Sequence, residues 1–321
     1  MADTKLQIAI YWGAAGGGCD VSILDTDEFI LTVDEVADIR LWPIAADGKY
    51  TDVEAMADAE LDVTIMNGAV RNSENEHMCK LLRQKSKIFV AYGSCAYMGG
   101  IPGLANLVTR EEIFERAYLN NPSIEPGNRT VPLAESKVNG YELEIPKFYE
   151  RVYKLDQIVD VDYYVPGCPP QFDQVKAVLG VIASGKLPPK GAVVGCTERA
   201  VCDECKREKA EKRVKKFYRP WQIVPDPNKC LLEQGVLCAG SATRGGCGVR
   251  CPNIGIPCRG CYGPPPNTMD QGAKMVSALS SIIDAHEPEE IEKILDQIAD
   301  PMGTFYRFSL AHSILRRVDK K

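Results

Sequence analysis

The sequence predicts an α/β protein in which a doubly wound parallel sheet is followed by an irregular, cysteine-rich region. Five short apolar runs in the first part of the chain do not alternate with polar residues, and helical patterns separate them. Such runs are typical of parallel strands that are covered on both faces. Nine of the thirteen cysteines then fall between Cys196 and Cys261, in sequence that is rich in glycine and proline.

The apolar runs define the predicted strands, and apolar spacing at three and four residues defines the predicted helices between them. We expect strands at residues 6–12, 39–44, 61–66, 87–92 and 161–165. We expect helices at residues 22–36, 73–85 and 171–184. Ser73 with Glu76 three residues later forms a capping-box pattern, which predicts that the second helix begins there.

Side chains suited to metal binding follow the predicted strands. The residues at the carboxyl ends are Cys19, Asp47, Asn67, Cys95 and Cys168. The carboxyl ends of parallel strands meet at one edge of the sheet, where ligands bind. Three cysteines that are distant in sequence are therefore expected to lie together at this edge of the sheet. Their proximity predicts a metal site. Cys79 lies within a predicted helix, and we expect it to be a buried structural thiol.

Eight further cysteines form two four-ligand sets, each containing one C-x-x-C pair. The first set is Cys202, Cys205, Cys230 and Cys238, and the second is Cys247, Cys251, Cys258 and Cys261. Two thiolates separated by two residues can turn inward on one loop and bind one metal centre. Zinc sites share such spacings, so zinc stays open as an alternative. Glycine and proline around the second set favour an iron–sulfur cluster, because glycine lets backbone N–H groups approach cluster sulfurs.

Composition excludes several classes of protein. The net charge of −6 over 321 residues gives no reason to expect nucleic-acid binding. No apolar run reaches the roughly 18 residues that cross a bilayer, so we expect no direct membrane insertion. The chain opens without a secretion signal, and an odd number of cysteines suits reduced thiols in the cytoplasm. The glycine run at residues 13–18 lacks the G-x-x-x-x-G-K-[ST] pattern, which argues against a nucleotide site.

The remaining segments carry weaker signals. Residues 206–216 mix both charge signs at helical spacing, which predicts a solvated helix face or, alternatively, a docking patch for an acidic redox partner. Residues 119–160 are polar and punctuated by proline, which indicates an insertion before the fifth strand. Residues 270–285 and 288–299 predict two helices, and residues 305–317 a third segment.

Three features together resemble the small subunit of [NiFe] hydrogenases. They are the strand-end cysteines, the turn at residues 167–170 (GCPP) and the segment at residues 258–264 (CRGCYGP). The resemblance covers almost the whole chain. Residues 93–104 (GSCAYMGGIPGL) and 257–264 (PCRGCYGP) are most similar to the F420-non-reducing, methyl-viologen-reducing type, which works with heterodisulfide reductase.

The resemblance implies three iron–sulfur clusters, expected to be [4Fe-4S], in two domains. A flavodoxin-like domain at residues 1–190 would hold the proximal cluster, and a domain at residues 191–321 would hold the medial and distal clusters. The implied proximal ligands are Cys19, Cys95 and Cys168. The implied medial ligands are Cys247, Cys251, Cys258 and Cys261. The implied distal ligands are Cys202, Cys205, Cys230 and Cys238.

The resemblance also implies a function without catalytic residues in this chain. Nickel and iron would belong to the large subunit, and electrons would pass from its active site through the three clusters to a ferredoxin-like or flavin-bearing partner. The implied partners are the large subunit, a small iron–sulfur subunit and a heterodisulfide-reductase-type flavoprotein.

The sequence departs from this family at the proximal site. Relatives have C-x-x-C after the first strand, but here Gly16 replaces the first cysteine. Asp47 is the candidate replacement ligand, and a three-iron cluster, a water ligand, Asp20 or Cys196 could serve instead. Asn67 stands where relatives usually carry glutamate. An alternative function is therefore a hydrogenase-derived iron–sulfur scaffold whose partner no longer uses hydrogen.

Overall fold

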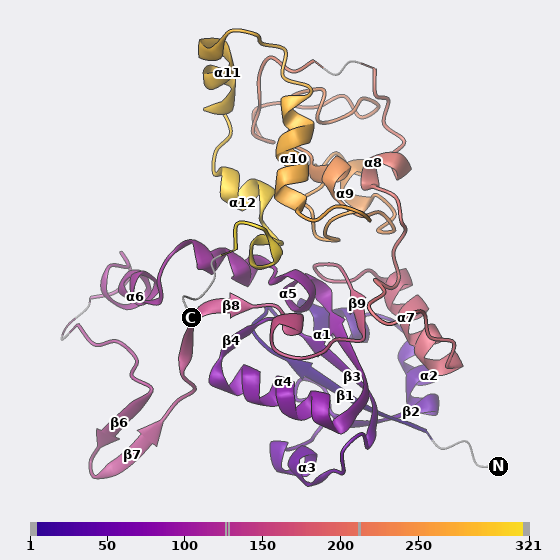
Figure 1. Cartoon of the computed structure of the whole chain (residues 1–321), viewed down its shortest axis with the longest axis vertical. Helices are drawn as coiled ribbons and strands as arrows, with labels where there is room; N and C mark the ends of the chain where they lie inside the picture. Colours follow the sequence, from indigo (N-terminus) through magenta and orange to yellow (C-terminus); the bar gives the residue numbers. More distant parts are fainter. Residues whose placement is uncertain (1–4, 126, 128, 211–212, 317–321) are drawn as a thin grey trace.

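The computed structural model describes residues 5–125, 127, 129–210 and 213–316. Its centre is a five-stranded parallel sheet with the strand order β2-β1-β3-β5-β9 (Figure 1). The strands are β1 (Leu6–Trp12), β2 (Ala37–Leu41), β3 (Leu61–Asn67), β5 (Ser86–Tyr92) and β9 (Tyr163–Val165). This is the flavodoxin-like order, in which the first strand lies between the second and the third. The predicted α/β fold class is confirmed.

The strand bounds agree with the prediction except at the sheet edges. β1 has the predicted bounds, whereas β2 begins at Ala37 and ends at Leu41 instead of covering residues 39–44. The strand ends because the Trp42 carbonyl accepts hydrogen bonds from the N–H groups of Ala45 and Ala46 in a turn. Pro43 in this turn has no N–H to donate to a strand ladder.

The helix predicted at residues 22–36 is two helices. α1 (Gly18–Leu24) and α2 (Phe29–Val36) are separated by a turn in which Asp27 has a φ of 51°. The Thr26 hydroxyl donates to the Ile23 carbonyl at 2.7 Å. This side-chain hydrogen bond competes with a backbone N–H for the same carbonyl. The earlier start of α1 places Cys19 in its first turn.

The helix at residues 73–85 is confirmed as α4 (Ser73–Lys85), but the predicted cap is wrong. Asn72 is the N-cap, and its side chain accepts the Asn75 N–H at 2.8 Å. The Ser73 hydroxyl instead accepts the N–H of Lys147 at 2.9 Å. The Ser73 hydroxyl therefore contacts a distant segment of the chain instead of capping the helix, as the local sequence pattern had predicted.

Helices cover both faces of the sheet (Figure 1). On one face α3 (Tyr50–Ala55) and α4 contribute Val53, Met78 and Leu82 to a buried core. On the other face α1, α2 and α7 (Phe172–Ser184) contribute Ile23 and Val178, among others, to a second core. The helix predicted at residues 171–184 is thus confirmed as α7.

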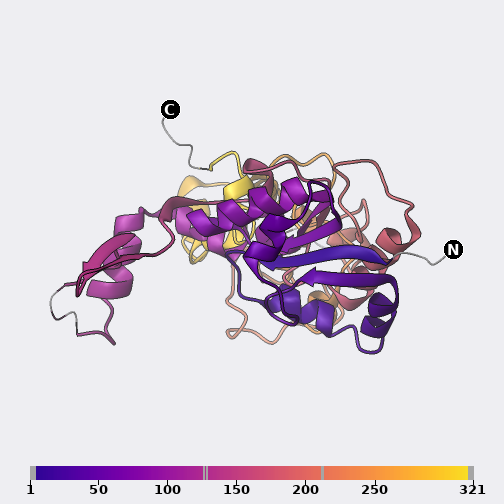
Figure 2. The ribbon, with the colours of Figure 1, turned by 90° about the horizontal axis from the view of Figure 1, so that it is seen from below.

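The insertion before the last strand forms a projecting arm (Figure 2). It contains α6 (Arg110–Phe114), a π-helical turn (Glu115–Leu119), β6 (Glu135–Val138) and β7 (Tyr141–Glu144). β6 and β7 form an isolated antiparallel hairpin. The chain returns through β8 (Phe148–Tyr153), which pairs with β4 (Val70–Asn72).

The C-terminal region consists of short helices joined by irregular loops. The helices are α8 (Val201–Glu204), α9 (Arg250–Asn253), α10 (Gln271–Ser280), α11 (Pro288–Leu295) and α12 (Pro301–Phe305). α10 and α11 confirm the two predicted helices with shorter bounds. The predicted segment at residues 305–317 contains the end of α12 and a 3-10 turn (Leu310–His312), and residue 317 lies outside the described residues. Within the described part of the chain, no helix is long and apolar enough to cross a membrane.

The helix predicted as one possibility for residues 206–216 is wrong. The described residues of this run contain no helix, and residues 211 and 212 lie outside the described part. Arg207 donates to three backbone carbonyls of neighbouring loops. Lys209 donates to the carbonyls of Cys202 and Cys205. These long side chains stabilise loops instead of a helix face.

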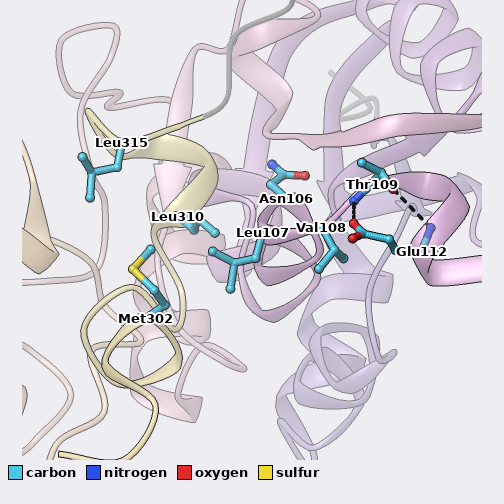
Figure 3. A pocket seen from close by; sticks show the side chains of 8 residues that line it. All are labelled: Asn106, Leu107, Val108, Thr109, Glu112, Met302, Leu310 and Leu315. Atoms are coloured by element: carbon cyan, nitrogen blue, oxygen red, sulfur yellow. Dashed lines mark hydrogen bonds between the residues drawn. The ribbon is translucent and has the colours of Figure 1, made fainter. Parts of the chain in front are cut away.

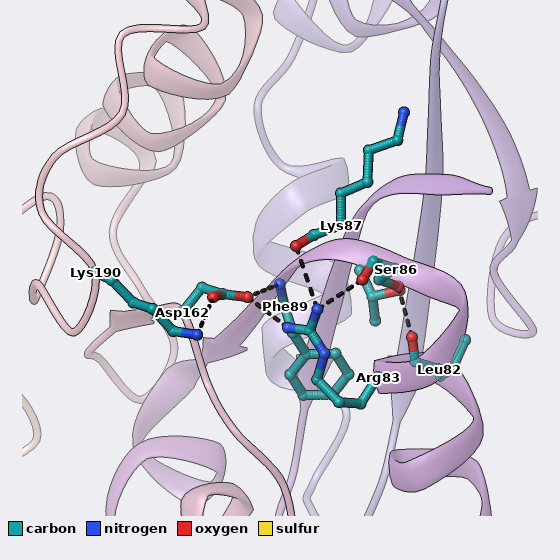
Figure 4. A network of polar contacts seen from close by, with 8 residues as sticks. Leu82, Arg83, Ser86, Lys87, Phe89, Asp162 and Lys190 are labelled. Atoms are coloured by element: carbon teal, nitrogen blue, oxygen red, sulfur yellow. Dashed lines mark hydrogen bonds and ion pairs between the residues drawn. The ribbon is translucent and has the colours of Figure 1, made fainter. Parts of the chain in front are cut away.

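A buried carboxylate ties the amino end of β9 to the rest of the sheet (Figure 4). Asp162 accepts the Phe89 N–H at 2.8 Å and pairs with Arg83 and with Lys190, the latter at 3.0 Å. Burial alone would raise the pKa of Asp162, but these three partners outweigh it and hold the pKa below its ordinary value. The charged carboxylate therefore stabilises the fold.

Replacing Asp162 with asparagine should weaken the attachment of β9 by about 2 kcal/mol, the usual size of hydrogen bonds to a charged group. Amide exchange in peptides from β5 and β9 of the assembled protein should quicken, and Asp38→Asn, at an exposed pair of 3.8 Å, should leave it unchanged. Because the folded pKa is lowered, this stabilisation is present above pH ~4 and is lost as the pH falls through the folded pKa. Unchanged exchange in Asp162→Asn would contradict this role.

Candidate metal centres

Three cysteines meet at the carboxyl edge of the sheet. Cys19 lies in α1 after β1, Cys95 lies in α5 (Gly93–Met98) after β5, and Cys168 follows β9. Burial raises the pKa of Cys19, and the charges of Cys95 and Cys168 raise it further. Burial likewise raises the pKa of Cys95, and the charge of Cys168 raises it further. The structure thus brings together the three thiols that the sequence placed at this edge, and their binding of metal stays a prediction.

The backbone packs directly against two of these sulfurs. Gly93 has a φ of 85°, and a Cβ at this position would overlap the Cys19 sulfur. A Cβ on Gly100 would lie 2.5 Å from the Cys95 sulfur. The Ile101 N–H donates to the same sulfur, which favours the thiolate form of Cys95. Glycine is required here because any side chain would displace a thiol.

A buried polar network lies next to Cys19. Asp20 is fully buried, and its two carboxylate oxygens accept from Trp42 Nε1 at 3.0 Å and from Asn67 Nδ2 at 2.9 Å. The other atom of that amide, Asn67 Oδ1, is buried without a hydrogen-bond partner among the described residues. The Asp20 charge raises the pKa of Cys19, after burial and the two neighbouring thiols.

Two residues that bear on a fourth ligand at this edge are exposed. Asp47 accepts the N–H of Gly48 at 2.9 Å. A Cβ added to Gly16 would meet no atom within 4 Å. The site therefore has room for a side chain at position 16. The fourth ligand itself, whether Asp47, Asp20, Cys196 or a water molecule, stays a prediction, as does a three-iron cluster that needs none.

The first C-terminal set lines one cavity. All four of its thiols, Cys202, Cys205, Cys230 and Cys238, are in the wall, together with Val201, Leu231, Gly240 and Pro252. The cavity encloses about 300 Å³ of free space, open solvent at its mouth included. A Cβ on Gly240 would lie 3.0 Å from the Cys202 sulfur, so glycine keeps the wall open. The four thiols that the sequence grouped therefore face one cavity, and their binding of a metal cluster stays a prediction.

The second C-terminal set lies beside the first. Burial raises the pKa of Cys261, and the charges of Cys247, Cys168 and Cys251 add to it. Burial raises the pKa of Cys258, and the charges of Cys238 and Cys261 raise it further. The Gly260 N–H donates to the Cys258 sulfur and acts in the opposite direction. Donors of this kind stabilise negative charge on sulfur.

Hydrogen bonds connect the three sets of cysteines. The Cys258 N–H donates to the Cys238 sulfur at 3.2 Å, which joins the second set to the first. The Cys168 N–H donates to the Cys261 sulfur, which joins the strand-end set to the second. The Ser94 hydroxyl lies within hydrogen-bonding distance of the carbonyls of Gly167 at 2.8 Å and Cys261 at 2.6 Å. The three sets therefore form one continuous series.

The surroundings of the first C-terminal set are compatible with an iron–sulfur cluster. Among the described residues, no group of three or more His, Cys, Asp or Glu side chains is tight enough for one metal ion. A multi-iron cluster bonds each thiolate to a different iron, so its ligands lie further apart. Four thiols around an otherwise mainly apolar cavity, with backbone N–H donors aimed at sulfur, suit such a group.

Two other thiols lie outside these sets. Cys79 is fully buried on α4, as expected for a structural thiol. Cys196 donates weakly to the Val193 carbonyl at 3.4 Å. Burial raises the pKa of Cys196, and Arg244 acts in the opposite direction. Neither observation gives these cysteines a ligand role.

A pocket between the arm and the C-terminal segment lies apart from the cysteines (Figure 3). Leu107, Met302 and Leu310 line it, and its polar residues include Thr109 and Glu112. These two form the capping box of α6, so their side chains already serve the helix.

Comparison with known proteins gives consistent matches. The family model described as "NADH ubiquinone oxidoreductase, 20 Kd subunit" matches residues 17–182. The iron–sulfur subunit of the F420-non-reducing hydrogenase from Archaeoglobus profundus is 42% identical, over 97% of this chain and 98% of its own length. The chain belongs to the family of F420-non-reducing hydrogenase iron–sulfur subunits.

A further relative agrees with this assignment. The corresponding subunit of the F420-non-reducing hydrogenase from Methanothermobacter marburgensis is 36% identical over 99% of this chain and 98% of its own length. A chain in a crystal structure of NAD+-reducing [NiFe]-hydrogenase in the H2-reduced state is 28% identical, covering 58% of this chain and 94% of its own, with a TM-score of 0.49. Membership of the family makes this chain the non-catalytic small subunit of an oxidoreductase.

Two hydroxyl residues of this hydrogenase subunit were missed by sequence reasoning. The Ser94 hydroxyl lies within hydrogen-bonding distance of two carbonyls between cysteine sets, and the Thr243 hydroxyl, next to Cys258, donates to the Ala239 carbonyl at 2.6 Å. Ser94 precedes Cys95 directly, so adjacency to a ligand was an available signal. Thr243 carries no such signal, because only folding brings it next to Cys258.

Gly93→Ala should remove the strand-end metal site, because the new methyl group overlaps the Cys19 sulfur at a left-handed backbone position. Iron in the purified assembly should fall by about four per chain, the content of one [4Fe-4S] cluster. Gly18→Ala is the matched control, since a Cβ there meets nothing within 4 Å. Equal iron in the two variants would argue against a metal site at this edge.

Proposed function

We propose that this chain is the electron-transfer subunit of a cytoplasmic [NiFe] hydrogenase and holds three iron–sulfur clusters, each [4Fe-4S] unless the missing ligand leaves the proximal one with three irons. The observation that carries the proposal is the continuous series of cysteine sets, joined by the Cys168 N–H at the Cys261 sulfur and the Cys258 N–H at the Cys238 sulfur. A series of this kind suits transfer of single electrons over a long distance.

The proposed ligands follow the three sets. Cys19, Cys95 and Cys168 hold the proximal cluster, with Asp47 as the proposed fourth ligand. Cys247, Cys251, Cys258 and Cys261 hold the medial cluster. Cys202, Cys205, Cys230 and Cys238 hold the distal cluster. We also propose the division into a flavodoxin-like domain at residues 1–190 and a cluster domain at residues 191–321.

When bound, the clusters supply reversible one-electron chemistry. The protein's own residues place the thiolates, exclude water and donate hydrogen bonds to sulfur, which sets the reduction potentials. Buried thiols such as Cys19 and Cys258 have raised pKa values, so assembly of the clusters releases protons. Ser94 is a positioning residue at the proximal-to-medial junction, because its hydroxyl bridges the two loops.

The proposed partners occupy the two ends of the series. The hydrogenase large subunit, with nickel and iron, lies against the proximal edge of the sheet. A small iron–sulfur subunit and a heterodisulfide-reductase-type flavoprotein lie beyond the distal set and receive the electrons. The relatives are named as hydrogenase subunits, which supports the first of these partners.

A second candidate function is a hydrogenase-derived scaffold that connects a partner without hydrogen chemistry. The observation that favours it is Asn67, whose buried Oδ1 lacks a hydrogen-bond partner among the described residues, together with Gly16. Nickel in the purified assembly separates the two functions, because only a hydrogenase large subunit retains it.

Cys168→Ser should reduce hydrogen-dependent viologen reduction by the assembled complex to background, because it removes a proximal ligand. Cys79→Ser is the matched control, a buried cysteine outside the three sets, and should retain turnover. Iron content and the EPR spectrum of the reduced complex show whether a cluster has been lost. Unchanged turnover in Cys168→Ser, or a complex that contains zinc and no iron, would contradict the proposal.

Gly16→Cys should supply the missing proximal thiolate, since the added side chain has free space. A thiolate gives the cluster more negative charge than water, and is a softer donor than carboxylate oxygen. The proximal potential should become more negative and its EPR signal should change, as followed by redox titration. Gly180→Cys on α7, also unobstructed, is the control. A Gly16→Cys spectrum identical to that of the parent would show that position 16 does not reach the cluster.

A further inference from the structure

Asp20 is a buried acidic residue that directly follows a proposed proximal ligand. It lies in the first turn of α1, next to Cys19, and its side chain is fully buried. Trp42, directly after β2, and Asn67, at the end of β3, each donate one N–H to its carboxylate, at 3.0 and 2.9 Å. Both of these neighbours are buried as well. The carboxylate is therefore held away from water beside the strand-end thiols.

The charge of Asp20 has no counter-ion. Within the described part of the chain, Asp20 forms no ion pair, and its two donors, an indole and an amide, are neutral groups. The nearby Tyr92 hydroxyl stays neutral because burial raises its pKa, and the charges of Cys19 and Asp20 raise it further. Burial of a charge without an opposite charge is unfavourable. The charge is therefore expected to serve something other than packing.

The hydrogen bonds around Asp20 do not require a carboxylate. Asn67 Oδ1 is buried without a hydrogen-bond partner among the described residues, and a carboxylate has no N–H to offer it. An amide at position 20 could accept the Trp42 N–H and donate to Asn67 Oδ1. A neutral side chain would thus serve this network without burying a charge.

The charge of Asp20 acts on the strand-end set. It raises the pKa of Cys19, after burial and the two neighbouring thiols, and so opposes negative charge on that sulfur. A cluster bound to Cys19 becomes more negative by one charge when it is reduced, and it meets the same repulsion. Charge near a cluster and burial of the cluster are among the factors that set its reduction potential. Salt screens buried charges only weakly.

We propose that the buried charge of Asp20 lowers the reduction potential of the proximal cluster. The inference rests on the proposed function and adds a residue that sets the potential without binding iron. The cluster gains one electron from the large subunit and passes one electron to the medial cluster, while Asp20 exchanges neither an electron nor a proton. A low proximal potential favours the second transfer, because the reduced cluster then gives up its electron more readily.

A charge of opposite sign lies at the medial set. Arg259 stands between Cys258 and Cys261 in the chain, and within the described residues it forms no ion pair. Burial lowers the pKa of Arg259, whereas the charges of Cys238 and Cys258 act in the opposite direction and favour its charged form. A positive charge beside a cluster raises its potential. Asp20 and Arg259 therefore both favour movement of electrons from the proximal to the medial set.

This role separates Asp20 from the missing fourth ligand. Both of its oxygens already accept an N–H, from Trp42 and from Asn67. Asp47, by contrast, is exposed and accepts the N–H of the adjacent Gly48. Asp47 can therefore be a ligand while Asp20 acts on the cluster through its charge.

The test is a redox titration of the assembled complex followed by EPR, in which the proximal signal is the one that Cys95→Ser removes. In Asp20→Asn the proximal midpoint potential should become less negative by about 59 mV, a ten-fold change in the ratio of reduced to oxidised cluster. Asp20→Glu keeps the charge and should stay close to the parent. Asp25→Asn, at an exposed aspartate that ends the same helix, is the matched control and should leave the potential unchanged.

Iron content and the potentials together decide the outcome. An unchanged potential in Asp20→Asn, or an equal shift in Asp20→Glu, would overturn the proposal, because charge would then not be the cause. Asp20→Ser, a second neutral variant, covers the case in which Asp20→Asn fails to assemble. Loss of the proximal signal in both neutral variants would make Asp20 a ligand or a structural residue and overturn the proposal. A parent complex with no signal that depends on Cys95 would instead overturn the proposed function.

Discussion

The structure must stabilise negative charge on buried cysteine sulfurs, and much of its architecture depends on this requirement. Taking a thiolate out of water raises its free energy, and burial raises the pKa of Cys19, Cys95 and Cys258 accordingly. The compensation comes from N–H groups and from the clusters that we propose. Backbone approaches sulfur closely only where side chains are absent, which accounts for Gly93 and Gly100 beside the strand-end thiols.

N–H···S hydrogen bonds also connect the sheet to the C-terminal loops. A cysteine that contributes its sulfur to one set contributes its N–H to the sulfur of the next, as Cys258 and Cys168 do. The Tyr262 hydroxyl adds a 2.7 Å bond to Gln174 on α7. The irregular C-terminal loops are therefore held in place by the sheet they pack against, and helices there need only be short.

Sequence predicted the elements whose cause is local and missed those whose cause is distant. Apolar runs located all five strands of the central sheet, because a strand that is buried on both faces consists mainly of apolar residues. The turn at Asp27 interrupts a run that apolar spacing alone cannot distinguish from one helix. Spacing also grouped the cysteines, whereas the contact of Ser94 with the Cys261 carbonyl depends on loops that meet only after folding.

The projecting hairpin of β6 and β7 exposes apolar side chains. Tyr141 is 73% exposed and Leu143 and Ile145 are each 50% exposed, so the ribbon buries little of its own apolar surface. Two paired strands alone are at best marginally stable in water, and a bare ribbon edge invites pairing with another chain. When this polypeptide is produced without its neighbours, the arm is therefore vulnerable to proteolytic nicking and to self-association.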